Sequence, residues 1–254
     1  MNRRNFLTSI AAASATTLLP VERSAAALAP AVGNIVLVHG LFADGSCWSD
    51  VIGHLQVAGL RATAVQNPLT SLDDAVSETR RVLAEQVGPT VLVGHSFSGV
   101  LVSEVGIDPK VTSLVYVAAR APDAGEDFAA LAKRFPTPPA TAGIIYDGDV
   151  GRLREEALLR DFAGDLPRDK ARILYAIQQP FHKALTAART TEAAWRSKPS
   201  FYAVSTEDRT INPDLERFMA RRMKAQTIEI RSSHLSLISH PTEIADLIIR
   251  ATSV

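Results

Sequence analysis

Short apolar runs alternate with stretches of helical periodicity from residue 33 to the C-terminus. The runs are continuously apolar and rich in β-branched residues, which is typical of strands buried on both faces of a parallel sheet. Five strong runs predict strands at residues 34–38, 90–93, 113–117, 200–204 and 227–230, and a weaker run predicts a sixth strand at residues 61–65.

Helical patterns occupy the intervals between these runs. Ser71 with Asp74 three positions later, and Asn212 followed by Pro213, are typical helix beginnings. Serine and asparagine side chains accept from free backbone amides there, and proline suits the first helical position. The alternation of strands with helices predicts an α/β fold whose open, mostly parallel sheet is flanked by helices.

One region interrupts this alternation. Residues 121–198 contain helical patterns at 152–162 and 167–178 and no strong strand, with a weak candidate at 144–146. We expect a mostly helical cap over the carboxyl edge of the sheet, where α/β folds bind ligands. A helical excursion that serves only packing is the alternative. In both cases the α/β core comprises residues 30–120 and 199–254.

Residues 1–29 have the pattern of an export signal. Arg3-Arg4 precedes an apolar, alanine-rich stretch that ends near Leu19, and the small-residue run 25–27 follows. This order is typical of signal peptides, and Arg-Arg-x-Phe-Leu resembles a twin-arginine signal. We therefore expect a protein exported by the twin-arginine route to the periplasm or the medium. No membrane association is expected after signal removal, because an apolar run of about 12 residues is too short to span a bilayer.

The composition excludes several classes of function. Lys plus Arg and Asp plus Glu both total 27, so no net charge attracts nucleic acid. The single cysteine, Cys47, excludes an intrachain disulfide and a multi-cysteine metal site, and the six histidines form no convincing metal set. We expect no metal, no other cofactor and no nucleic-acid partner. A small-molecule substrate suits this neutral chain, and a homodimer is left open.

The segment 94–99, Gly-His-Ser-Phe-Ser-Gly, lies between an apolar strand and a helical pattern. A strand, a sharp turn and a helix form the context in which a serine becomes an exposed nucleophile. Ser96 would then lie at a helix N-terminus, where backbone amides stabilise negative charge. Ser98 occupies the position of the last glycine of G-x-S-x-G, and serine is still small. The alternative for Ser96 is a simple helix cap.

A serine nucleophile needs a histidine base that is itself held by a carboxylate. Asp208 and His234 follow the strands predicted at 200–204 and 227–230, so they should lie at the same sheet edge as Ser96. Glu207 is an alternative for the carboxylate. His240 precedes Pro241 and is better interpreted as the cap of the last helix.

The first predicted strand ends at His39-Gly40-Leu41-Phe42, on the same edge. The backbone amides of Leu41 and Phe97 are positioned there to stabilise a carbonyl oxygen that becomes an oxyanion. A purely structural turn is the alternative. Aromatic side chains are the candidates for the substrate pocket, with Phe42, Tyr146 and Trp195 foremost, and Phe97, Phe128, Phe162 and Phe181 as further candidates.

These motifs resemble the small α/β-hydrolases related to plant methyl-ester esterases and hydroxynitrile lyases. The resemblance rests on residues 36–40, residues 94–96, the Asp208 loop and Ser233-His234; it covers residue 33 to the C-terminus and is weakest in the cap. It implies a six-stranded parallel core with a helical lid, and cofactor-free hydrolysis of small esters. It also implies that Ser96, Asp208 and His234 form a catalytic triad, with Leu41 and Phe97 as oxyanion donors.

Two departures favour esterase over lyase chemistry. The lyases carry threonine where this chain has Gly40, and lysine where it has Leu235, so a departing cyanide would lack its cation. We expect a serine hydrolase that cleaves carboxylic esters through an acyl-enzyme. A perhydrolase or acyltransferase on the same triad, and a ligand-binding protein that retains a hydrolase site, are the alternatives.

Overall fold

Six parallel strands form the central sheet of the computed structural model, which describes residues 32–254. Every neighbouring pair in this sheet is parallel, and each of the six predicted strands is present. In spatial order they are β2 (Arg61–Val65), β1 (Asn34–Val38), β3 (Thr90–His95), β4 (Val111–Val117), β8 (Ser200–Ser205) and β9 (Gln226–Ile230). The predicted fold class is confirmed.

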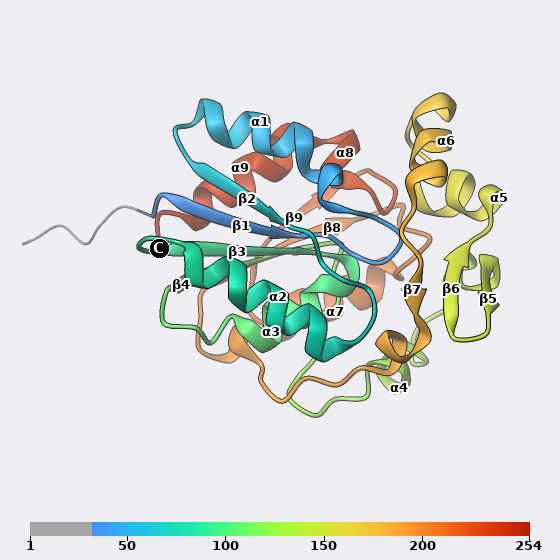
Figure 1. Cartoon of the computed structure of the whole chain (residues 1–254), viewed down its shortest axis with the longest axis horizontal. Helices are drawn as coiled ribbons and strands as arrows, with labels where there is room; N and C mark the ends of the chain where they lie inside the picture. The colour runs from blue at the N-terminus through green and yellow to red at the C-terminus, as the bar shows by residue number, and fades with distance from the viewer. Residues whose placement is uncertain (1–31) are drawn as a thin grey trace, which may run out of the picture.

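Helices cover both faces of the sheet (Figure 1). One face carries α1 (Ser49–Val57), α8 (Ser236–Ser239) and α9 (Pro241–Ala251). The other carries α2 (Leu72–Glu85), α3 (Gly99–Val105) and α7 (Pro213–Arg222). Because the sheet lies between these two layers, every residue of β1, β3 and β8 is buried, which explains their continuous apolar sequences.

Both predicted helix caps form the expected side-chain hydrogen bonds. Ser71 Oγ accepts from the amide of Asp74 at 3.1 Å, and Asn212 Oδ1 accepts from the amide of Asp214 at 2.9 Å. His240 occupies the cap position of α9 but its side chain does not cap the helix. Its Nδ1 instead lies 2.9 Å from Ser239 Oγ.

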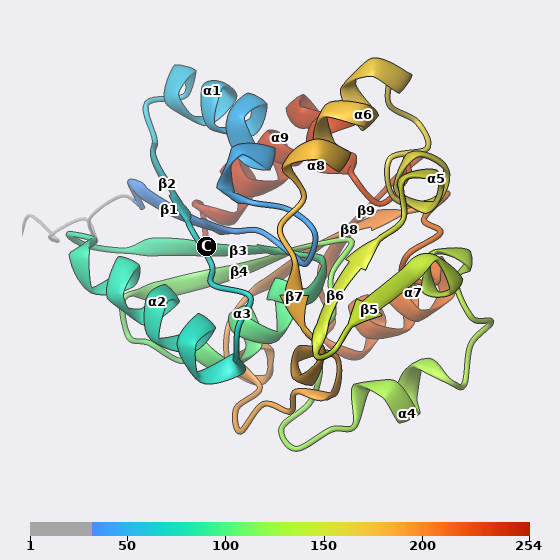
Figure 2. The same cartoon turned by 45° about the vertical axis from the view of Figure 1, so that its right-hand side comes forward.

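The inserted region contains a small antiparallel sheet as well as helices, so the prediction of a mostly helical cap needs correction (Figure 2). The expected helix at 152–162 begins instead as a strand and continues as a short helix with a π-helical turn at Leu158–Phe162. The cap elements are α4 (Phe128–Ala132), β5 (Ile144–Asp147), β6 (Val150–Leu153), α5 (Glu155–Ala157), α6 (Arg168–Ile177) and β7 (Phe181–His182).

Two glycines explain the extra strands. Gly148 has a φ of +58°, which permits the tight turn between β5 and β6. A Cβ on Gly151 would lie 2.6 Å from ring atoms of Phe181, so only glycine lets β6 pair closely with β7. Short strands of this kind lack the long apolar runs that reveal the core strands.

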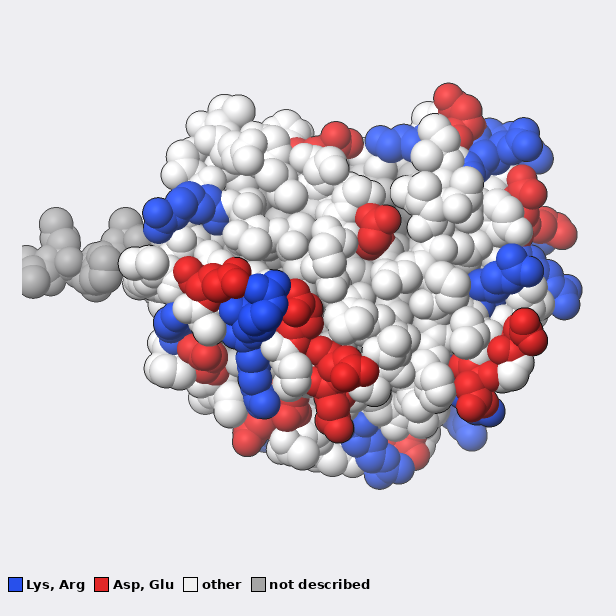
Figure 3. Space-filling model, viewed as in Figure 1, with Lys and Arg blue, Asp and Glu red and all other residues white. Residues whose placement is uncertain are grey.

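The cap lies at the end of the sheet toward which the strands run, and the C-terminus lies at the opposite end (Figure 1). Acidic and basic side chains are interspersed over the face shown in Figure 3, without a large region of one sign. Within residues 32–254, none of the helices has both the length and the apolar character needed to cross a membrane. The export signal predicted at residues 1–29 lies outside the described residues.

Candidate active site

Ser96 lies in a strained turn between β3 and α3. Its φ is +56°, in the left-handed region that non-glycine residues rarely adopt. Small neighbours make this turn possible: a Cβ on Gly94 would lie 2.6 Å from Val102 Cγ2, and a Cβ on Gly99 would overlap the carbonyl oxygen of Arg120. The backbone therefore holds the Ser96 side chain away from the sheet, as predicted for a nucleophile.

Ser98, the departure from the glycine pattern, forms a specific contact. Its hydroxyl donates to the carbonyl oxygen of His39, on the loop that follows β1. His39 in turn accepts from the amide of Asn67 at 3.0 Å through Nε2, and its Nδ1 lies 2.9 Å from the carbonyl oxygen of Gly40. Burial lowers the pKa of His39, so a neutral ring that donates from Nδ1 fits both contacts. These bonds tie the turn at Ser96 to the loop at Leu41.

The structure brings the three predicted triad residues together. His234 Nε2 lies 2.7 Å from Ser96 Oγ, and His234 Nδ1 lies 2.5 Å from Asp208 Oδ2. The His234 and Asp208 side chains have no exposed surface, and Ser96 retains 7% of its accessible surface. Each residue follows the carboxyl end of a different strand, so the parallel topology alone places them at one edge.

Backbone amides hold the Asp208 carboxylate in place. Its Oδ1 accepts from the amides of Thr210 and Ile211, at 2.6 and 2.9 Å, which leaves Oδ2 for the imidazole. The alternative acid, Glu207, pairs with Arg231 at 2.7 Å on the surface instead. The neighbouring carboxylates thus point in different directions.

His95 packs against His234. Its Nε2 lies 3.0 Å from the carbonyl oxygen of His234, and the two ring centroids are 4.7 Å apart. Burial, reinforced by the nearby His234 ring, holds the pKa of His95 well below its ordinary value, so His95 is a neutral donor at Nε2. The contact shows that His95 braces the segment carrying His234.

Glu216 is a buried acid that the sequence analysis missed. Its side chain lies in α7 beside Asp208, and its Oε2 accepts from the amide of Ser205 at 3.1 Å. Burial and the adjacent Asp208 carboxylate raise the pKa of Glu216 well above its ordinary value, so the fold favours the protonated form of this carboxyl. Nothing in the sequence of α7 distinguishes Glu216 from Asp214, the exposed acid of the same helix.

The two predicted oxyanion donors border the same cavity as Ser96. Phe97 belongs to the first helical turn after the strand, where amides have no acceptor within the helix. Leu41 lies in the turn after β1, and Gly40 keeps this turn close, because a Cβ there would lie 2.6 Å from Ser96 Cβ. Phe42 completes the turn with a φ of +66°. The turn that carries Leu41 and the one that carries Phe97 thus meet beside Ser96.

A largely apolar cavity of about 350 Å³ opens at Ser96. Phe42 and Tyr146 line it as predicted, together with Phe97, Phe128 and Phe181. Phe162 is not among the lining residues. Its ring packs against that of His234, with 5.2 Å between the ring centroids. The cap supplies most of the remaining wall, including Ile144 and Leu153, so access to Ser96 is governed by the cap.

Trp195, the third predicted pocket residue, does not line this cavity. Its Nε1 donates to the carbonyl oxygen of Pro122 at 2.8 Å. The guanidinium groups of Arg196 and Arg222 lie over its ring at 4.9 and 5.3 Å from the centroid. Trp195 is thus a packing residue that fixes the start of the cap, and its assignment to the pocket is wrong.

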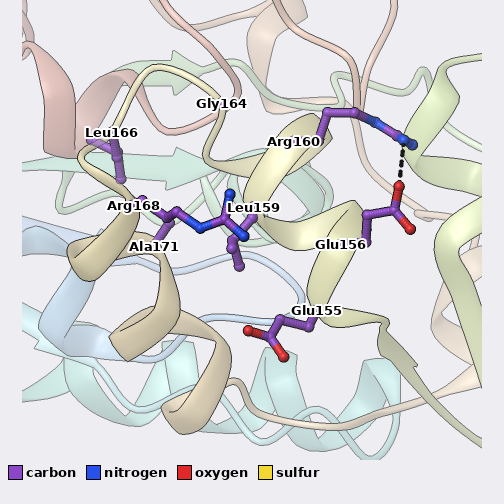
Figure 4. A pocket seen from close by; sticks show the side chains of 8 residues that line it. All are labelled: Glu155, Glu156, Leu159, Arg160, Gly164, Leu166, Arg168 and Ala171. Carbon is purple, nitrogen blue, oxygen red and sulfur yellow. Dashed lines mark hydrogen bonds and ion pairs between the residues drawn. The ribbon is translucent and has the colours of Figure 1, made fainter.

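A second, more open hollow lies in the cap, between α6 and the helical segment that begins with α5 (Figure 4). It shares no lining residue with the cavity at Ser96. Its wall carries no serine or histidine, and Arg160 there is paired with Glu156 at 3.0 Å. Across residues 32–254, no group of three or more His, Cys, Asp or Glu side chains is arranged to hold a metal ion. The cavity at Ser96 is therefore the candidate active site.

Comparison with known proteins agrees with this geometry. The model of the family described as "Alpha/beta hydrolase family" matches residues 35–247. The chain belongs to the α/β-hydrolase family. This confirms the family resemblance predicted from the motifs.

Relatives of this α/β hydrolase fall in the esterase branch. Methylesterase 7 of Arabidopsis thaliana is 27% identical over 248 residues, which cover 84% of this chain and 94% of that protein. The carbendazim hydrolyzing esterase of Nocardioides sp. (strain SG-4G) is 36% identical over 128 residues, covering 45% of this chain and only 53% of that protein. Among solved structures, a pyrethroid hydrolase from Sphingobium faniae JZ-2 has the same fold, with a TM-score of 0.74, 21% identity, and 88% and 98% of the two chains covered.

Proposed function

We propose that this α/β hydrolase cleaves small carboxylic esters through an acyl-enzyme formed on Ser96. One observation carries the proposal: a continuous chain of hydrogen bonds runs from Asp208 through His234 to the Ser96 hydroxyl, which opens into an apolar cavity. The esterase names of the relatives support the same class of substrate.

The first half of the reaction forms the acyl-enzyme. His234 Nε2 accepts the Ser96 proton as Oγ attacks the ester carbonyl carbon, and Asp208 stabilises the imidazolium through Nδ1. The amides of Leu41 and Phe97 donate to the oxyanion, and each such donor contributes about 3 kcal/mol to the transition state. The tetrahedral intermediate then collapses, and His234 returns the proton to the departing alcohol.

The second half releases the acid. Water takes the place of the alcohol, and His234 accepts its proton as it attacks the acyl carbon. Collapse of the second intermediate breaks the bond to Ser96 Oγ, which regains its proton from His234. Two backbone amides hold Oδ1 of Asp208 throughout, so Oδ2 stays on Nδ1 of His234.

Replacement of Ser96 by alanine tests this proposal. We expect Ser96→Ala to reduce turnover of a neutral aryl acetate at least about 10³-fold, because the acyl-enzyme cannot form. The fold should persist, as measured by circular dichroism and thermal unfolding. Ser77→Ala is the matched control, since Ser77 is exposed on α2, and it should retain full activity. Undiminished turnover in the Ser96 variant would refute the proposal.

A further inference from the structure

One charged side chain lines the cavity at Ser96. Of the cavity's wall residues among the described part of the chain, Arg120 alone carries a charge, and the others are apolar, aromatic, or bear only a hydroxyl. Arg120 lies just after β4, and its amide donates to the carbonyl oxygen of Ser96 at 2.9 Å. The backbone thus fixes the base of this side chain beside the candidate nucleophile.

The guanidinium of Arg120 has aromatic neighbours and no anionic partner. It lies 4.7 Å from the ring centroid of Phe128, on the cap, and 5.8 Å from that of Phe97, beside Ser96. Within residues 32–254, no carboxylate forms an ion pair with it and no hydrogen bond from its side chain offsets its burial. By contrast, Arg222, which is also partly buried, pairs with Glu126, and the exposed Arg209 pairs with Asp161.

Arg120 is partly buried, and its guanidinium is a cation at the cavity wall with no anionic partner among the described residues. Burial lowers the pKa of Arg120 to about 10, so the group is still protonated at neutral pH. Contacts with aromatic faces offset only part of the desolvation of a charged group, which has five N–H donors to satisfy. An arginine kept in an otherwise apolar pocket therefore leaves a site for an anion.

We propose that Arg120 determines substrate specificity by binding a carboxylate group carried by the ester. This inference rests on the proposed esterase function. The planar guanidinium donates two parallel hydrogen bonds to a carboxylate, and the apolar remainder of the cavity holds the hydrocarbon between the carboxylate and the ester. The substrate class is thus an ester with a free carboxylate on the acyl or the alcohol side, such as a half-ester of a dicarboxylic acid.

Matched pairs of charged and neutral esters test the proposal. On the acyl side, the monomethyl esters of succinic, glutaric and adipic acids are compared with methyl butanoate, pentanoate and hexanoate, by methanol release. On the alcohol side, 4-acetoxybenzoate is compared with 4-methylphenyl acetate. We expect the native protein to favour the charged member of at least one set by about 10²-fold in kcat/KM, and the favoured set identifies which side carries the carboxylate.

Arg120→Met removes the charge and keeps an unbranched apolar side chain. We expect it to abolish the preference for the charged ester and to change kcat/KM for the neutral esters less than about three-fold. Arg120→Lys, which keeps the charge without the planar fork, should retain part of the preference. Arg134→Met is the matched control, because Arg134 also lies over a phenylalanine ring, that of Phe218 at 5.5 Å, but outside the cavity.

The neutral esters separate this proposal from the esterase function. If the native protein hydrolyses them and shows no preference for charged esters, the role of Arg120 is refuted while the esterase function stands. An equal loss for charged and neutral esters in Arg120→Met would also overturn the proposal, because it would show a general effect on the reacting centre. Absence of turnover with every ester would instead contradict the esterase function itself.

Discussion

The carboxylate of Asp208 is divided between two tasks at the scale of single atoms. Oδ1 is held by the amides of Thr210 and Ile211, and Oδ2 meets Nδ1 of His234. This arrangement fixes both the direction of the carboxylate and the tautomer of the imidazole, which must keep Nε2 free for Ser96. Glu207, one residue earlier, lies at the surface with Arg231 and has neither role.

Asp208→Asn should therefore reduce kcat for a neutral ester by about 10³- to 10⁴-fold, because an amide NH₂ at this position favours the wrong tautomer of His234. The measurement is steady-state kinetics together with a thermal unfolding midpoint. Glu207→Gln is the matched control and should leave kcat nearly unchanged. A larger loss in the Glu207 variant would assign the orienting role to that residue instead.

The elements of the cap are joined to the loops that carry the site. Asp161, in the π-helical turn after α5, has no exposed surface and pairs with Arg209 at 2.7 Å and Arg160 at 2.8 Å. The hydroxyl of Ser233, which precedes His234, donates to Asp165 Oδ1 at 2.5 Å, and its Oγ lies 3.2 Å from the carbonyl oxygen of Phe162. The cap is thus attached beside both Asp208 and His234, so its position and theirs are coupled.

We expect Asp161→Asn to lower the free energy of unfolding by about 1–3 kcal/mol, because it leaves two arginines without their buried charged acceptor. Turnover should fall as well, since Arg209 adjoins Asp208. Urea unfolding and steady-state kinetics measure the two effects. Glu156→Gln removes the other partner of Arg160. Because the Glu156 side chain is 83% exposed, this change should alter the free energy of unfolding by less than about 0.5 kcal/mol. Equal stability of both variants would show that the buried pair does not secure the cap.

The core elements were predictable and the cap elements were not, for a physical reason. Core strands are buried on both faces, so their apolar runs are visible in the sequence, and the parallel topology then brings Ser96, Asp208 and His234 to one edge. The strand β6 has the sequence Val-Gly-Arg-Leu and is half exposed, so its pairing depends on β5 and β7 rather than on its own pattern. Nothing in the sequence around Arg120 or Glu216 marks these residues. Only the fold places Arg120 in the cavity wall and buries Glu216 beside Asp208.

The whole molecule responds to pH through the acid buried behind the site. Glu216 is ionised above about pH 4.5 in the unfolded chain and keeps its proton to a higher pH in the fold, because burial and Asp208 raise its pKa. A folded-state pKa above the unfolded value gives stability that is complete below the unfolded pKa and is lost as pH rises toward the folded one. This carboxyl therefore makes the fold less stable at neutral than at mildly acidic pH.

Glu216→Gln replaces the protonated carboxyl by a neutral group of the same shape and removes this dependence. We expect the free energy of unfolding of the variant, relative to the native protein, to increase between about pH 5 and about pH 8. Urea unfolding across this range measures the difference. Glu243→Gln, at an exposed position on α9, should show no such trend. A constant difference for the Glu216 variant would mean that this group is ionised in the fold.

The architecture as a whole places one serine at the meeting point of a parallel sheet, a mixed cap and an apolar cavity. The most direct test of the account is labelling of the full chain with a fluorophosphonate, followed by peptide mapping, because this reagent reacts with an activated serine. We expect a single adduct on the peptide that contains Ser96, lost in Ser96→Ala and strongly slowed in His234→Ala. An adduct on another serine, or an unlabelled Ser96 in a preparation that hydrolyses esters, would contradict it.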